Sequence, residues 1–147
     1  MDTLRAAPSA GALYPLELYV VVNNVRGLER GLYHYNILEH SLELLKIGDF
    51  RRKIINCALH QEMTGKANVT FVLTGIFDRI TWKYDERGYR YAYIEAGHIS
   101  QNIYLQSISL GLGSVAVGAF YDESLNNFLG VDGKAEAAIY MHAVGKK

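Results

Sequence analysis

A loop of small residues near the start of the chain is the place where the backbone itself could contact a ligand. It runs Pro8-Ser9-Ala10-Gly11-Ala12-Leu13-Tyr14-Pro15 and holds both prolines of the sequence. Because proline fixes φ, two prolines seven residues apart hold a loop in shape. Side chains as small as these let backbone amides approach a flat or anionic ligand closely. An ordinary turn that leads into a strand is the alternative interpretation.

Metal, hydrolase and dinucleotide chemistry find no support among the other reactive residue types. The five histidines, at positions 34, 40, 60, 98 and 142, form no metal-binding spacing, so we predict no metal site. Glu95 and His98 lie one helical turn apart, which favours an internal pair over two metal ligands. Gly111-Leu112-Gly113 is predicted to end a helix, whereas a dinucleotide fingerprint opens one. No Gly-x-Ser-x-Gly motif occurs.

Length and composition predict one soluble domain over residues 1–147. Lysine plus arginine and aspartate plus glutamate each total 15, so no basic excess points to nucleic acid. No leader and no apolar run of bilayer length is visible, which favours a cytoplasmic protein that does not enter a membrane. The single cysteine, Cys57, lies among apolar residues and is expected to be a buried structural thiol.

Alternating strand and helix patterns predict a layered α+β domain that positions these residues. The segment between residues 78 and 91 is polar and aromatic, with Gly88 expected to break any helix. The predicted strands are 16–23, a hairpin of 31–35 with 41–46, a central strand 67–76, a strand or loop 115–120, and 135–144. The predicted helices are 49–61, a long one over 93–110, and 122–129.

Several further motifs follow the proline loop in a fixed order, and together they resemble a known family. They are Lys83-Tyr84, Arg87-Gly88-Tyr89-Arg90-Tyr91, Glu95-Ala96-Gly97-His98 with Gln101-Asn102, Gly111-Leu112-Gly113, and Val117-Gly118-Ala119-Phe120. The chain resembles the nitroreductase superfamily of flavoproteins from Arg5 to Gly145. Within that superfamily it is similar to the SagB-type dehydrogenases, which oxidise azolines to azoles on ribosomal peptides.

The resemblance implies a mostly antiparallel central sheet flanked by helices, in an intertwined homodimer with FMN at the subunit interface. It implies that Pro8, Ser9, Ala10 and Gly11 lie beside the flavin ring. It also implies that Ala116, Val117, Gly118 and Ala119 present backbone N–H groups toward flavin N5 and O4, where fixed dipoles tune the chemistry. Gln61 stands where the family contacts the pyrimidine edge of the flavin.

The resemblance further implies that Lys83 and Tyr84 support proton removal from a heterocyclic substrate. The alternative is a solvated cation beside an interface tyrosine. The predicted function is therefore an FMN-dependent oxidoreductase that transfers hydride through flavin N5. Its substrate would be a heterocycle, a peptide or another small electron acceptor, and its electrons would come from NAD(P)H or from the substrate itself.

The arginine-rich segment that binds the FMN phosphate in this family would lie upstream of Met1, so the domain is predicted to be N-terminally short. Lys146, with Lys147 beside it, is the remaining candidate for the phosphate, against the alternative of a solvated tail. Three explanations would account for the missing arginine-rich segment: a second chain supplies it, the sequence is truncated, or the protein no longer binds flavin. The rival function is accordingly a non-catalytic or two-chain module that has lost or shares its FMN phosphate site, or a flavin carrier without turnover.

Overall fold

A computed structural model of the chain describes residues 4–147. A short 3-10 turn, η1 (Ala10–Ala12), precedes the first strand. The strands are β1 (Leu16–Val22), β2 (Gly31–Asn36), β3 (Ser41–Ile47), β4 (Val69–Ile76), β5 (Leu112–Val117) and β6 (Glu136–Lys146). The helices are α1 (Arg51–Cys57), α2 (Met63–Lys66), α3 (Asp78–Tyr84), α4 (Arg87–Ser109) and α5 (Asp122–Leu129).

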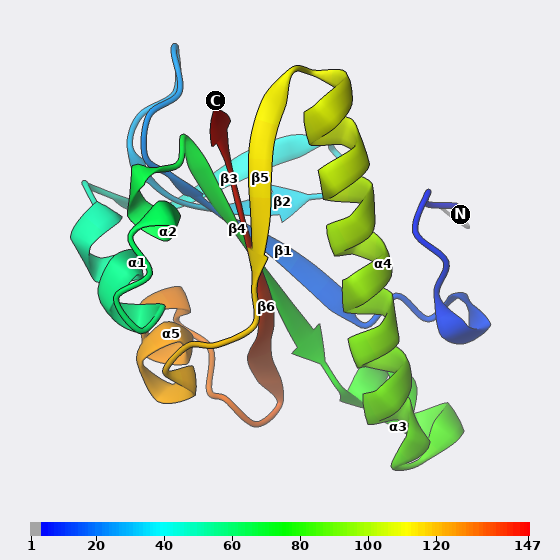
Figure 1. Cartoon of the computed structure of the whole chain (residues 1–147). Helices are drawn as coiled ribbons and strands as arrows, with labels where there is room; N and C mark the ends of the chain where they lie inside the picture. The colour runs from blue at the N-terminus through cyan, green and yellow to red at the C-terminus, as the bar shows by residue number, and fades with distance from the viewer. Residues whose placement is uncertain (1–3) are drawn as a thin grey trace.

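The strands form one sheet in the order β3-β2-β1-β4-β6-β5, and every neighbouring pair is antiparallel. Figure 1 shows α1, α2 and α5 on one side of this sheet and α3 and α4 on the other. The predicted α+β architecture, with an antiparallel sheet between helices, is confirmed. The segment expected to form the central strand is β4, which pairs with β1 and β6.

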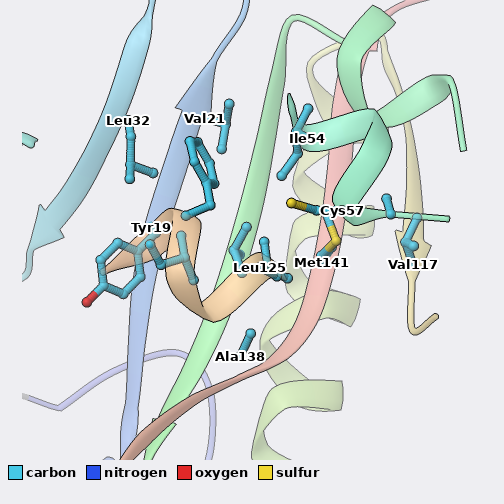
Figure 2. Packing of buried hydrophobic residues seen from close by; sticks show 13 residues of the cluster. Tyr19, Val21, Leu32, Ile54, Cys57, Val117, Leu125, Ala138 and Met141 are labelled. Carbon is cyan, nitrogen blue, oxygen red and sulfur yellow. The ribbon is translucent and has the colours of Figure 1, made fainter. Parts of the chain in front are cut away.

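The larger core lies between the sheet and the helices α1 and α5 (Figure 2). Ile54 and Cys57 of α1 and Leu125 of α5 are fully buried against Val21 and Met141 of the sheet. The Cys57 thiol lies 3.2 Å from the Ser124 hydroxyl. Cys57 is therefore the buried thiol that the sequence predicted. A second core packs α4 against the opposite face, through Ala92 and Ala96.

Two predictions of local structure were wrong. The helix expected over 49–61 ends at Cys57, because Leu59 and His60 adopt left-handed φ angles of 55° and 62° that no helix continues through. Residues 78–91 are helical except for Asp85 and Glu86, which separate α3 from α4, so the break precedes Gly88 and Gly88 itself lies inside α4. A Cβ at Gly88 would lie 3.1 Å from the Thr81 Cα, so this glycine permits close packing of α4 on α3.

Other boundaries agree with the sequence-based expectations. Gly111, with a φ of 71°, follows α4 directly and turns the chain into β5. The segment 115–120, expected to be a strand or a loop, divides between the two. Strand β5 ends at Val117, and residues 118–121 form a loop that leads into α5. None of the helices within residues 4–147 combines the length and apolar character that crossing a bilayer demands.

Candidate functional site

The N-terminal loop is a strained turn organised around Ser9. Gly11, Ala12 and Tyr14 have φ angles of 60°, 53° and 47°, a region that residues other than glycine rarely adopt. The Ser9 carbonyl accepts the Ala12 N–H at 3.0 Å, and the Ser9 hydroxyl oxygen accepts the Tyr14 N–H at 3.0 Å. The same hydroxyl donates to Glu95 Oε2 of α4 at 2.5 Å, which fastens the loop to the long helix.

This loop lies directly against the predicted catalytic pair at the end of α3. A Cβ on Gly11 would come within 2.7 Å of the Tyr84 hydroxyl and 3.0 Å of Lys83 Nζ. The Tyr84 ring packs edge-on against Tyr91 of α4, with ring centroids 5.0 Å apart. Lys83 is exposed and Tyr84 is half-buried. The structure thus brings Gly11 against Lys83 and Tyr84, which lie more than 70 positions later in the sequence.

The second predicted segment is held at both ends by hydrogen bonds. The Ala116 N–H donates to the Tyr104 hydroxyl oxygen at 2.7 Å, and the Tyr121 N–H donates to the Cys57 carbonyl at 2.8 Å. Between these anchors, the N–H groups of Gly118 and Ala119 meet no hydrogen-bond acceptor within residues 4–147. Two adjacent backbone donors on a fixed and exposed turn can therefore bind the polar edge of a ligand.

Gln61 lies against this segment. Its side-chain amide nitrogen donates to the carbonyl oxygens of Ala58 and Ala119, both at 3.0 Å. These two bonds use both amide hydrogens, so only the side-chain carbonyl of Gln61 remains for a ligand. Gln61 thereby fixes the peptide of Ala119, and its own contact with a flavin stays a prediction.

The two predicted walls of the flavin slot do not meet within one chain. In Figure 1 the loop at residues 8–11 and strand β5 flank α4 on opposite sides. Gly118 lines a hollow of about 410 Å³, together with Tyr93, Phe120, Asp122 and Tyr140.

Lys146, the predicted phosphate ligand, ends β6 beside another hollow of about 480 Å³. Lys66 and Glu62 line the same hollow, together with residues that include Gly113 and Gly145. The Lys66 ammonium pairs with the Glu62 carboxylate one helical turn earlier. Sequence reasoning missed Lys66, because nothing in its local motif indicates that α2 approaches the last strand.

A buried polar group behind β5 was also missed. His142 of β6 is 1% exposed, and its Nδ1 lies 2.7 Å from the Ser100 hydroxyl. Burial lowers the pKa of His142 to about 4, so the ring is neutral at pH 7. The Tyr104 ring packs edge-on against it at 4.4 Å. The spacing of Ser100 and Tyr104 on one face of α4 is the only sequence signal for this group.

Glu95 is a second buried polar residue, 2% exposed, on the side of α4 that faces the N-terminal loop. Burial raises the pKa of its carboxyl group, while the Ser9 hydrogen bond and the charges of Arg5 and His98 act in the opposite direction. His98 Nδ1 lies 3.3 Å from the Pro8 carbonyl oxygen, so both members of the predicted Glu95–His98 pair contact the loop.

Residues 1–146 match the family model described as the nitroreductase family. The chain is 38% identical over 143 residues to MJ1384 of Methanocaldococcus jannaschii, a protein named as a nitroreductase, and this covers 97% of the chain and 71% of MJ1384. It is 32% identical over 140 residues to the trifolitoxin-processing protein TfxB of Rhizobium leguminosarum bv. trifolii, covering 92% of the chain and 38% of TfxB.

Among solved structures, the Escherichia coli microcin synthetase McbBCD complex with truncated pro-MccB17 bound contains a similar chain. The TM-score is 0.86 at 27% identity, covering 98% of this chain and 56% of that one. The chain therefore spans little more than a third of TfxB and about half of the microcin synthetase chain. As its motifs predicted, the chain belongs to the nitroreductase family, in the SagB-type branch.

Proposed function

We propose that this chain binds FMN and works as an oxidoreductase on a heterocyclic substrate carried by a peptide. The observation that carries the proposal is the contact of Gly11 with Lys83 and Tyr84. The loop of small residues, which a ligand can approach closely, therefore lies next to a pair of side chains that can transfer a proton. When bound, FMN supplies a hydride acceptor at N5, which is the chemistry that such an oxidation needs.

The residues on this chain suit the parts of FMN that they would hold. The free N–H groups of Gly118 and Ala119 are donors for the electron-rich edge of the ring, and Gln61 with Tyr104 keeps that segment fixed. The small residues Pro8, Ser9, Ala10 and Gly11 form a wall without bulk. Lys146 and Lys66, beside the glycine-lined hollow, suit a phosphate.

A homodimer would complete the slot, since one chain keeps its two walls on opposite sides of α4. An exposed apolar stripe on α4 supports this arrangement. Ile94, Leu105 and Ile108 are 49%, 58% and 67% exposed and follow helical spacing. Gly97 lies in the same stripe, and a Cβ there would meet nothing within 4 Å, so a second helix can approach closely.

Oxidation of an azoline to an azole removes one proton and one hydride from the ring. In this proposal Lys83 accepts the proton at Nζ, and the Tyr84 hydroxyl orients the ring by hydrogen bonding. The names of TfxB and of the microcin synthetase complex support a peptide substrate and partner chains for this protein too. NADH or NADPH is the alternative electron source, with a small acceptor as substrate.

The rival proposal, a flavin-fold module that shares its phosphate site with a second chain, rests on the charges around the hollow. Both cations that line it are lysines, and Lys66 is already paired with Glu62. Lysine binds phosphate as a point charge and lacks the bidentate geometry of arginine. A second chain that contributes an arginine would strengthen the site.

Titration of the purified protein with FMN tests the main proposal. We expect flavin absorbance at about 450 nm to co-purify or be restored by added FMN, and to bleach on addition of NADH, NADPH or an azoline peptide. Lys146→Ala should weaken FMN binding about 10-fold, the value of one charge-assisted contact. The matched control is Lys53→Ala, an exposed cation of α1. A colourless protein that binds no added FMN would overturn the proposal. FMN that binds but is never reduced by NADH, NADPH or an azoline peptide would favour the carrier.

A further inference from the structure

The carboxyl group of Glu95 has no part in the chemistry proposed above, yet it is buried at the base of the active loop. Its only hydrogen-bond donor within residues 4–147 is the Ser9 hydroxyl, at 2.5 Å. Burying a carboxyl group to 2% exposure costs free energy. We therefore expect a role that an apolar residue at this position could not fill. What Glu95 does is hold one specific oxygen, Ser9 Oγ.

That oxygen organises the strained part of the loop. Ser9 Oγ accepts the Tyr14 N–H at 3.0 Å while it donates to Glu95, so its own orientation is set by the carboxylate. Tyr14 and Ala12 sit at positive φ without the freedom of glycine. Such conformations persist only where surrounding contacts impose them, and they cluster at functional sites.

Two further side chains contact the same loop. The Arg5 guanidinium lies 4.0 Å above the Tyr14 ring, and His98 Nδ1 lies 3.3 Å from the Pro8 carbonyl. Arg5 and His98 are also the charges that act on Glu95. Ser9, Arg5 and His98 therefore form one cluster around this carboxylate, and every member touches residues 8–14.

We propose that Glu95 is a positioning residue, which through Ser9 keeps the loop in its strained conformation and so holds Gly11 against Lys83 and Tyr84. The consequence for turnover rests on the function proposed above, whereas the hold on the loop does not. Gly11 contacts both ends of the pair, Tyr84 Oη and Lys83 Nζ, so a relaxed loop changes the position of both.

Hydrogen exchange at the Tyr14 amide, in protein without flavin, tests the hold on the loop. In Glu95→Ala the Tyr14 N–H should exchange at least about 10-fold faster, because its acceptor Ser9 Oγ is no longer oriented. Ser9→Ala removes the acceptor itself and should do the same. Glu95→Gln keeps an acceptor for the Ser9 hydroxyl and should restore much of the protection. Glu123→Gln, an exposed glutamate of α5, is the matched control.

Kinetics of the FMN-loaded protein test the effect on the catalytic pair. Glu95→Ala should lower kcat per bound flavin by roughly 10- to 100-fold, with KM within about 3-fold of wild type. The Ser9→Ala and Glu95→Ala effects should not add, since both act through one bond. Glu95→Gln and Ser9→Ala keep the test open if Glu95→Ala does not fold.

Unchanged Tyr14 exchange in Glu95→Ala and Ser9→Ala overturns the proposal. Faster exchange with wild-type kcat also overturns it, because the loop would then not position the pair. A wild-type protein that binds no FMN refutes the proposed function instead, and the exchange measurement still decides whether Glu95 holds the loop.

Discussion

The Gln61 side chain donates a hydrogen bond to the Ala119 carbonyl oxygen at 3.0 Å, joining the turn after α1 to the loop after β5. The same nitrogen donates to the Ala58 carbonyl, which fixes the amide orientation. A peptide whose carbonyl is held in this way points its neighbouring N–H groups in a constant direction. The relationship explains why a polar side chain stands at position 61, 58 residues before its partner.

Replacement of Gln61 by alanine should weaken FMN binding about 10-fold, the value of one lost hydrogen bond near 1.4 kcal/mol. The free energy lost is that of keeping the donors at Gly118 and Ala119 aligned. Quenching of flavin fluorescence during titration gives the dissociation constant. Asn127→Ala, on the exposed side of α5, is the control and should leave it unchanged. Equal affinity in the Gln61 variant would show that this contact does not organise the site.

The chain offers a matched pair of glycines for the contact between the loop and the catalytic pair. Gly11 and Gly27 both have positive φ, 60° and 79°, but a Cβ at Gly27 would meet nothing within 4 Å. Gly27→Ala should therefore cost only backbone strain, about 1–2 kcal/mol. Gly11→Ala should cost more, since its Cβ would collide with Tyr84 Oη. Urea denaturation measures both, and equal losses would argue against close packing at Gly11.

Removal of the proton-moving groups should slow turnover without affecting cofactor binding. Lys83→Ala and Tyr84→Phe should each lower kcat about 10²- to 10⁴-fold, the range of general acid–base catalysis. FMN affinity should stay within about 2-fold of wild type, because neither of these two side chains is among the groups proposed to bind FMN. Steady-state kinetics with FMN-loaded protein decide this. A large loss of FMN with little loss of kcat per bound flavin would reassign the pair to cofactor binding.

Stability should depend on pH through His34, which bridges two strands. Burial acts to lower the pKa of His34, but its hydrogen bonds with Glu17, at 2.7 Å, and Glu43, at 3.2 Å, outweigh burial and raise it. The stabilisation is therefore complete below the unfolded value of about 6.5 and is lost as pH rises through the higher folded pKa. Urea denaturation from pH 5 to 9 should show this loss in wild type but not in His34→Gln.

His60→Asn is the control for that series. His60 is exposed, and asparagine tolerates the positive φ at this position. His142 changes stability in the opposite direction and over a lower range. Its folded pKa of about 4 lies below the unfolded value, so acid destabilises the fold between about pH 6.5 and 4. A profile flat above pH 6.5 in wild type would exclude the role given to His34.

Local sequence patterns determined most of the fold and the two segments of the site. Apolar runs set the strands, and the segment of β4 is predicted to be the central strand because it is rich in residues that favour strands. Small residues between the prolines indicate the loop at 8–15, because a turn depends on the conformational preferences of adjacent residues. The same local reasoning failed at Gly88, where contact with Thr81 outweighs the weak helix propensity of glycine.

Only the tertiary structure decided which distant residues meet. The Gly11 contact with Lys83 and Tyr84, the Ser9–Glu95 bond and the Gln61–Ala119 bond join positions between 58 and 86 residues apart. His142 and Lys66 carried no local signal, and the helical spacing of Ser100 and Tyr104 did not say what the two side chains would meet. Such contacts depend on how α4 and the β5 loop pack against the sheet, and packing is set by all the elements together.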